Sequence, residues 1–374
     1  MAGIYIHIPF CKQACSYCDF HFSTSLKHKA DLVKALVKEI VQKKRELTTI
    51  INTIYFGGGT PSLLEVDDLK TIIDAVYKNY NVASKIELTL ECNPDDLTKQ
   101  KLQELKSSGI NRLSIGVQSF DGEELKFFNR AHNASEAESS IKRSQDIGFE
   151  NITIDLIYGS PILTEQIWVK NLQKVNDFKV PHLSAYGLTV EPQTKLEKQI
   201  KTGCVPVLSD DNMIAQFKIL IAKTKEFGLT QYEVSNFGKE GFYSQHNSNY
   251  WKGEAYLGIG PSAHSFIHDK RIWNVANNIK YIKALKNNET YAEDEIIDEK
   301  TAFNEYVLTR LRTIWGVDMD YVAKNFNPAL NRHFRKEIKP YLNSSYLQTD
   351  KNKITLTQEG IFIADKITSD LFFV

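Results

Sequence analysis

Three cysteines lie close together near the start of the chain, in the segment CKQACSYC at residues 11–18. Cys11, Cys15 and Cys18 form a Cys-x3-Cys-x2-Cys pattern, and three thiolates on one loop can close around a soft metal centre. The spacing is compatible with two kinds of metal centre: a zinc ion, or an iron–sulfur cluster, which normally takes four cysteines. A cluster with three cysteines would keep one iron open for a further ligand. A fourth zinc ligand could come from His7, Asp19 or His21.

The chain has five cysteines, and the other two stand alone in the sequence. This distribution does not fit a disulfide framework, and it indicates a reducing compartment with a metal or redox site near the N-terminus. We expect Cys92 and Cys204 to be small buried residues. The start of the chain lacks the pattern of a signal peptide, and no apolar run approaches the ~20 residues that cross a bilayer. We therefore expect a soluble, cytoplasmic protein.

Strand-like and helix-like patterns alternate through the first half of the sequence and must position the cysteines. About six such strand–helix units predict a parallel sheet, either doubly wound or closed into a barrel. In both arrangements a site is expected at the C-terminal ends of the strands. The strand patterns are at 4–8, 52–56, 85–91, 111–117, 152–157 and 182–188. The helical patterns are at 32–41, 67–78, 97–107, 121–128, 135–147 and from 164 onwards.

Polar residues and a glycine segment stand at the predicted strand ends. Glu91, Gln118 and Asp155 each lie at or near the end of a strand pattern. They could simply face solvent where a strand ends, but three in succession favour a shared site. The segment GGGTPS at 57–62 follows the second strand and lacks the Gly-Lys-Ser/Thr ending of a phosphate-binding loop. A plain glycine turn is the alternative.

The pattern changes at about residue 294. Helices are predicted at 303–314, 319–324 and 331–340, then a hairpin at 347–357 and a last helix at 359–371. This order is typical of a winged-helix module. The sequence therefore predicts two domains, 1–293 and 294–374.

Composition indicates an ordinary globular protein of 374 residues with 42% hydrophobic and 25% charged residues. Lys plus Arg and Asp plus Glu both number 46, so the formal charge is zero. Proteins that grip nucleic acid usually carry a basic excess, so we expect no nucleic-acid partner. The same argument favours a packing or partner-binding role for the winged-helix-like module.

The stretch YIHIPFC at 5–11, followed by Cys15, Tyr17 and Cys18, resembles the signature of radical S-adenosylmethionine (SAM) proteins. More narrowly, it is similar to the group that contains oxygen-independent coproporphyrinogen III oxidase and a heme chaperone. The resemblance implies an α/β fold, a partial (β/α)6 barrel with a C-terminal winged-helix-like α+β module. It also implies a [4Fe–4S] cluster on Cys11, Cys15 and Cys18, with SAM chelating the fourth iron and yielding a 5′-deoxyadenosyl radical when it is cleaved.

The resemblance also assigns residues to SAM. Tyr17 matches a position that packs on the adenine, and Gly58, Gly59 and Thr60 match the segment at the methionine end, where absent side chains let the backbone approach. A carboxylate and an arginine suit a ligand that has an ammonium and a carboxylate group. The implied SAM-binding residues are Tyr5, Tyr17, Gly58, Gly59, Thr60, Glu91, Gln118, Arg130 and Asp155.

Two features separate the oxidase from the chaperone branch of this group. The oxidase typically has a fourth cysteine two residues after the third, where this chain has Phe20. The segment HNSNYW at 246–251 contains the His-Asn-x-x-Tyr-Trp motif of the chaperone branch. His246 beside two large aromatics could offer an axial nitrogen to heme, and His264 is a similar candidate. The alternative for His246 is a core histidine hydrogen-bonded through both ring nitrogens.

Three functional hypotheses follow. The leading one is a heme chaperone with three cofactors, a [4Fe–4S] cluster, SAM and heme, and without coproporphyrinogen III oxidase activity. Its partners would be heme and heme-accepting apoproteins, membrane-associated acceptors included. The second is the oxidase itself, which removes hydrogen from propionate side chains before decarboxylation. The third is a radical SAM modifier of RNA or protein that uses the C-terminal module to dock its substrate. Cleavage of SAM and oligomeric state stay open.

Overall fold

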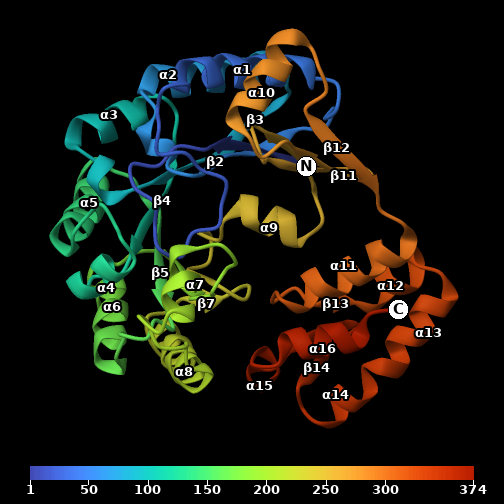
Figure 1. Ribbon diagram of the computed structural model, residues 1–374. Helices are drawn as coiled ribbons and strands as arrows, with labels where there is room; N and C mark the ends of the chain where they lie inside the picture. Colours follow the sequence, from blue (N-terminus) through green and yellow to red (C-terminus); the bar gives the residue numbers. More distant parts are fainter.

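The computed structural model describes residues 1–374 and is built around one large sheet (Figure 1). Its strands follow the order β12-β11-β10-β9-β1-β2-β3-β4-β5-β6-β8-β7. The six predicted strands are adjacent and parallel to one another, which confirms the predicted parallel sheet. They are β1 (Ala2–Ile8), β2 (Ile51–Gly58), β3 (Val82–Cys92), β4 (Arg112–Gln118), β5 (Asn151–Tyr158) and β6 (His182–Gly187).

Helices connect these strands and form an arc around the outer side of the sheet (Figure 1). This is the partial (β/α)6 barrel that the resemblance to radical SAM proteins implied. The helices are α1 (Lys29–Gln42), α2 (Val66–Asn79), α3 (Lys99–Ser107), α4 (Gly122–Phe127), α5 (Ala134–Asp146) and α6 (Glu165–Asp177), with one-turn helices η1 (Pro61–Leu63) and η2 (Pro94–Asp96).

Polar side chains fix where several helices begin. Thr98 accepts a hydrogen bond from the backbone N–H of Lys101 at the start of α3. Thr164 accepts one from the backbone N–H of Ile167 at the start of α6. Asn133 and Glu136 form a reciprocal capping box at the start of α5. Such caps satisfy N–H groups that have no partner within the helix, and each typically stabilises the protein by about 1 kcal/mol.

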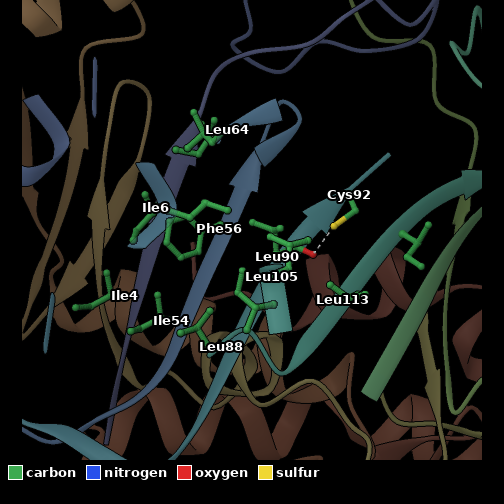
Figure 2. Packing of buried hydrophobic residues seen from close by; sticks show 14 of the residues in the cluster. Ile4, Ile6, Ile54, Phe56, Leu64, Leu88, Leu90, Cys92, Leu105 and Leu113 are labelled. Atoms are coloured by element: carbon green, nitrogen blue, oxygen red, sulfur yellow. Dashed lines mark hydrogen bonds between the residues drawn. The ribbon is translucent and has the colours of Figure 1, made fainter. Parts of the chain in front are cut away.

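The outer face of the strands carries the apolar core. Figure 2 shows Ile4 and Ile6 of β1, Phe56 of β2 and Leu90 of β3 packed side by side, and all are fully buried. Side chains alternate between the two faces of a strand. The residues between these apolar positions therefore face the barrel interior, and many are polar. The inward residues of β1 to β6 include Tyr5, His7, Thr53, Tyr55, Thr89, Glu91, Arg112, Ser114, Thr153, Asp155, His182 and Ser184.

The region after β6 extends both edges of the sheet, and the sequence patterns did not predict it. At one edge β9 runs parallel to β1, and β10, β11 and β12 continue antiparallel beyond it. At the other edge β8 and β7 are antiparallel to their neighbours. The elements are α7 (Lys195–Lys201), α8 (Asp210–Glu226), β7 (Thr230–Gln231), β8 (Asn236–Gly238), α9 (Gln245–Trp251), β9 (Ala255–Ile259), β10 (His264–Ile267), β11 (Lys270–Asn274), α10 (Asn278–Asn287) and β12 (Ala292–Ile296).

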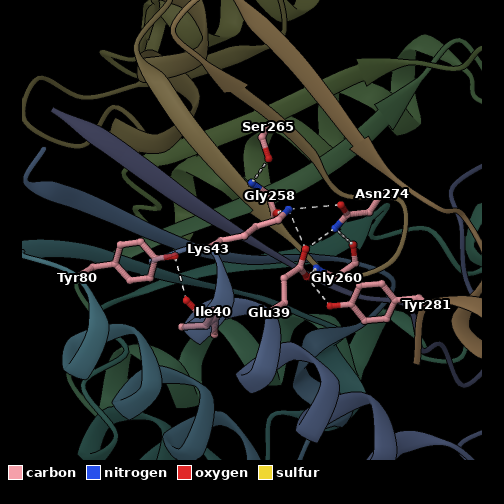
Figure 3. A network of polar contacts seen from close by, with 9 residues as sticks. All are labelled: Glu39, Ile40, Lys43, Tyr80, Gly258, Gly260, Ser265, Asn274 and Tyr281. Atoms are coloured by element: carbon pink, nitrogen blue, oxygen red, sulfur yellow. Dashed lines mark hydrogen bonds and ion pairs between the residues drawn. The ribbon is translucent and has the colours of Figure 1, made fainter. Parts of the chain in front are cut away.

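A buried polar network ties α1 to the added edge of the sheet (Figure 3). The fully buried carboxylate of Glu39 lies 2.9 Å from Lys43 Nζ, one helical turn later. It also accepts hydrogen bonds from Asn274 Nδ2 (2.8 Å), from the backbone N–H of Gly260 (2.7 Å) and from the hydroxyl of Tyr281. One carboxylate thus joins α1, α10, β11 and the residue that follows β9.

The C-terminal segment forms a second apolar core, separate from that of the barrel. Its helices surround the three-stranded sheet β13-β15-β14, in the predicted winged-helix-like arrangement. The predicted boundary at 293/294 falls inside strand β12, which pairs with β11 of the large sheet. The division into two domains therefore stays a proposal. The elements are α11 (Glu299–Leu311), β13 (Val317–Asp318), α12 (Met319–Asn325), α13 (Pro328–Glu337), α14 (Lys339–Asn343), β14 (Leu347–Asp350), β15 (Lys353–Leu356), α15 (Gln358–Ile361) and α16 (Ala364–Leu371).

The last predicted helix is interrupted. Residues 359–371 fall into α15 and α16, which are separated at Phe362 and Ile363. No helix in the structure combines the length and the apolar character that crossing a membrane requires.

Candidate metal and cofactor site

The three neighbouring cysteines lie on a loop that is closed at its base. The loop leaves β1 at its C-terminal end, where Phe10 pairs with Ser23 in a short bridge. The backbone N–H of Cys11 donates to the carbonyl of Ser23 (3.1 Å), and the N–H of Ser23 donates to the carbonyl of Pro9 (2.8 Å). The loop therefore begins and ends at the mouth of the barrel, as predicted for a site on a parallel sheet.

The middle of the loop is attached to the opposite side of the mouth. The backbone N–H of Ser16 donates to the carbonyl of Phe128 (3.1 Å), and its hydroxyl donates to the carbonyl of Phe127 (2.9 Å). The carbonyl of Ser16 accepts from the N–H of Leu196 in α7 (2.8 Å). Lys12 pairs with Asp95 near the end of β3 (2.6 Å). These contacts hold the cysteines over the strand ends.

The donor set of this loop fits a multi-iron cluster better than a single ion. All three thiols are free and half-buried, and burial raises the pKa of Cys18 to about 11. No three His, Cys, Asp or Glu side chains are grouped closely enough to hold one metal ion. Each cysteine of a cluster binds a different iron, so the ligands of a cluster stand further apart than those of one ion.

Two of the candidate zinc ligands are engaged elsewhere. His7 Nε2 lies 3.0 Å from the carbonyl of His21, and His7 Nδ1 lies 3.1 Å from the hydroxyl of Tyr5. His21 Nε2 lies 2.8 Å from Asn278 Oδ1. The pKa of His7 is lowered to about 4, chiefly by burial, so the ring is neutral at pH 7.

Glu91 stands at the end of β3 against the glycine segment. Its carboxylate accepts hydrogen bonds from the hydroxyl of Tyr55 (2.8 Å) and from the backbone N–H of Gly58 (3.1 Å). Burial raises the pKa of Glu91 to about 7. A methyl group built on Gly57 would lie 3.0 Å from Glu91 Oε1, so only a residue without a side chain lets the strand pass this close.

Arg130 reaches from the α4–α5 connection to the cysteine loop. Its Nη1 donates to Cys15 Sγ (3.2 Å), and its Nη2 donates to Asn93 Oδ1 and to the carbonyl of Gly116 (2.8 Å each). Its Nε atom is buried and has no partner. Gln118 ends β4 with a φ of +66°, and a methyl group on Gly116 would lie 3.1 Å from Gln118 Nε2 and 3.2 Å from Arg130 Nη2. These two side chains therefore lie together.

The remaining residues assigned to SAM lie at the same mouth. Asp155 is on β5, and burial raises its pKa to about 6. The ring of Tyr17 packs edge-on against Phe128 with ring centres 5.4 Å apart, and Tyr5 stacks on Tyr55 at 6.1 Å. The positions assigned to the glycine segment, Gly58, Gly59 and Thr60, directly follow Phe56 and Gly57 of β2.

His246 lies deeper in the barrel, on α9. It is buried, with Nδ1 2.8 Å from Thr53 Oγ1 and Nε2 2.7 Å from the hydroxyl of Tyr250. Burial lowers the pKa of His246 to about 3. Both ring nitrogens are thus engaged, which favours the structural alternative, and a heme-ligand role stays a prediction. His264 is exposed on β10.

Sequence reasoning missed four residues that shape this interior: Thr53, Tyr55, Asn93 and Arg112. Thr53 is hydrogen-bonded to His246, Tyr55 to Glu91, and Asn93 to Arg130. Polar residues at alternate positions of an otherwise apolar strand were the available signal.

Gly58 offers a test of how tightly the segment packs. It has a φ of +108°, and a methyl group there would lie 2.5 Å from His7 Cε1. We expect Gly58→Ala to lower the free energy of unfolding by about 2–4 kcal/mol, the sum of backbone strain and a steric clash. Gly109→Ala is the matched control, since Gly109 has a φ of +92° and open space around it. It should cost about 1–2 kcal/mol in the same urea titration, and equal losses would contradict the clash.

A loop of three cysteines at the mouth of a parallel β/α barrel defines a radical SAM domain. The family model of the radical SAM superfamily matches residues 5–175, and that of the HemN C-terminal domain matches residues 297–363. Membership of the superfamily implies a [4Fe–4S] cluster and SAM.

The most similar relatives narrow this class. The heme chaperone HemW of Lactococcus lactis is 32% identical over 97% of this chain and 95% of its own. The heme chaperone HemW of Bacillus subtilis is 31% identical, with 98% of each chain covered. The chain belongs to the HemW family. The solved structure of the Escherichia coli coproporphyrinogen III oxidase HemN, 22% identical, superimposes with a TM-score of 0.87 over 99% of this chain and 90% of that one, and it supports the fold.

Proposed function

We propose that this protein binds heme and delivers it to acceptor apoproteins, and that it carries a [4Fe–4S] cluster and SAM. The observation that carries the proposal is the match along nearly the whole chain to relatives named heme chaperone HemW. The side chain of Phe20 supports it, because it is 67% exposed beside the cysteine loop, at the position where the oxidase typically has a further cysteine. Membrane-associated acceptors are included in the proposal.

The residues at the mouth suit this cofactor set. Cys11, Cys15 and Cys18 would hold the cluster, and reductive cleavage of a sulfonium is the chemistry that cluster and SAM supply when bound. Glu91 can accept a hydrogen bond from the amino group of SAM, and Arg130 can donate to its carboxylate. The remaining residues assigned to SAM are Tyr5, Tyr17, Gly58, Gly59, Thr60, Gln118 and Asp155.

A heme titration tests the proposal. We expect the anaerobically reconstituted protein to bind heme, seen as a shifted Soret band, and to form no protoporphyrinogen IX from coproporphyrinogen III. If His246 is an axial ligand, His246→Ala should change the Soret position whereas His264→Ala should not. Release of His246 from Thr53 or Tyr250 would have to accompany binding. Failure of the wild-type protein to bind heme would contradict the proposal.

Oxidase activity is the second candidate. It rests on the shared fold alone, which the Escherichia coli oxidase has over 99% of this chain and 90% of its own. Porphyrinogen product above a control without protein would support it, and the same reconstituted sample serves both assays. A role as a modifier of RNA or protein has only the C-terminal module in its favour.

A further inference from the structure

A buried arginine lies inside the barrel without an ion-pair partner. Arg112 is the first residue of β4, is 2% exposed, and is among the largest fully buried side chains of the chain. Its Nε atom has no hydrogen-bond partner. None of the ion pairs of the chain includes it. Burying a charge without compensation costs several kcal/mol, so a role for the charge is expected.

The two strands beside β4 carry inward carboxylates near this charge, Glu87 and Glu91 on β3 and Asp155 on β5. Arg112 is in register with Thr89 of β3 and Asn151 of β5. Glu91 lies two residues beyond Thr89, one inward-facing step closer to the mouth. Asp155 lies on β5, on the same face and further towards the mouth. The arginine therefore lies beneath Glu91 and Asp155, between the strands that carry them.

The electrostatics of the cluster agree with this geometry. Burial raises the pKa of Glu91 to about 7 and that of Asp155 to about 6, and the charge of Arg112 opposes the rise in both. Burial lowers the pKa of His182 and of His246, and Arg112 adds to that effect. The interior thus combines neutral histidines with two carboxylates that both feel the charge of Arg112, and Asp155 also feels that of Arg130.

We propose that Arg112 is a positioning residue for SAM, whose buried charge keeps Glu91 and Asp155 as carboxylates ready to receive the cationic ligand. The proposal rests on the proposed function, since it takes SAM as the ligand of this mouth. SAM carries a sulfonium and an ammonium against one carboxylate, so it has a net positive charge. A site with two ionised carboxylates attracts it, whereas a site with protonated carboxyls does not.

Few other groups near the two carboxylates change charge between pH 6 and 8.5. Burial raises the pKa of each of the tyrosines and lowers that of His182 and His246, and Arg130 stays cationic throughout this range. The facing groups are Tyr5, Tyr55, Glu87, Arg130, His182, Tyr186, Tyr232, His246 and Tyr250. A change in SAM affinity over this range therefore reports on Glu91 and Asp155.

The test is the pH dependence of SAM binding to cluster-reconstituted protein, measured by equilibrium dialysis from pH 6 to 8.5. Wild type, Arg112→Gln and Arg112→Lys are compared, with the partly exposed Arg143→Gln as control. Loss of the buried cation should raise both carboxyl pKa values, and SAM affinity weakens as pH falls through those values. If both carboxyl pKa values rise by about one unit and SAM needs both groups ionised, Arg112→Gln should bind about 25-fold more weakly than wild type at pH 6.5 and within about twofold at pH 8.5. Arg112→Lys keeps the charge and should stay near wild type.

Each outcome has one meaning. A loss of affinity in Arg112→Gln that is equal at every pH would mean a structural role and overturn the proposal, and so would unchanged affinity. Iron content and thermal unfolding are recorded for each variant and identify one that fails to fold. If Arg112→Gln does not fold, the test uses Arg112→Lys: the pH at which its SAM affinity falls to half is compared with the same pH for wild type. Absence of SAM binding by the wild type would instead overturn the proposed function. The ionisable groups of SAM titrate in the same way in every sample, so their effect cancels when a variant is compared with wild type.

Discussion

Replacing Cys11, Cys15 or Cys18 with alanine is expected to abolish the cluster, with iron falling from about four per chain to near zero after anaerobic reconstitution. The physical reason is that three thiols on one loop leave no spare ligand. The nearby imidazoles cannot substitute, because His7 and His21 are hydrogen-bonded to other groups. Iron and sulfide analysis and the visible charge-transfer absorbance measure the effect.

The chain supplies its own control for this experiment. Cys204 is exposed, not buried as the sequence predicted, and it lies after α7, outside segment 11–18, so Cys204→Ala should retain wild-type iron. Full iron in Cys15→Ala, or equal loss in Cys204→Ala, would contradict the assignment of the three ligands. Loss of SAM binding should accompany loss of iron, because SAM is a ligand of the open iron in the proposed site.

The second large effect is on stability. Glu39→Gln keeps the size of the side chain but removes the only carboxylate paired with buried Lys43 (Figure 3). Removing one partner of a buried ion pair leaves an uncompensated charge and typically costs about 3–5 kcal/mol. We expect a loss of this size in the free energy of unfolding, measured by urea titration of the apoprotein.

An exposed pair in the same chain gives the matched comparison. Glu123 and Lys126 are each 76% exposed and lie 2.7 Å apart, so Glu123→Gln should change stability by less than about 1 kcal/mol. The double variant Glu39→Gln/Lys43→Met removes both charges and should recover part of the loss. A Glu39→Gln protein as stable as Glu123→Gln would show that the network contributes little.

Local patterns in the sequence predict the parallel half of the fold. Apolar alternation identifies β1 to β6, because each strand buries one face against helices that follow it directly. The same patterns place the cysteines after β1 and place Glu91, Gln118 and Asp155 at strand ends. These residues do meet at one mouth, since parallel strands all end at the same edge.

The edges of the sheet and the deep interior could not be predicted in this way. Strands β7 and β8 have two and three residues, too few for a periodic signal. Strand β9 is defined by its pairing with β1, which lies far away in the sequence. The partners of His246 and the isolation of Arg112 likewise arise only when α9 and the strands come together.

That pairing of β1 with β9 has a consequence for the order of synthesis. Strand β1 is made first, but its second neighbour is made only when the ribosome reaches Ala255–Ile259. Gly260, which follows, packs against the backbone of His7. Until then β1 has an unpaired edge, and the base of the cysteine loop lacks this support. Domains form from the N-terminus as the chain emerges, so metal loading is expected to follow translation of more than two thirds of the chain.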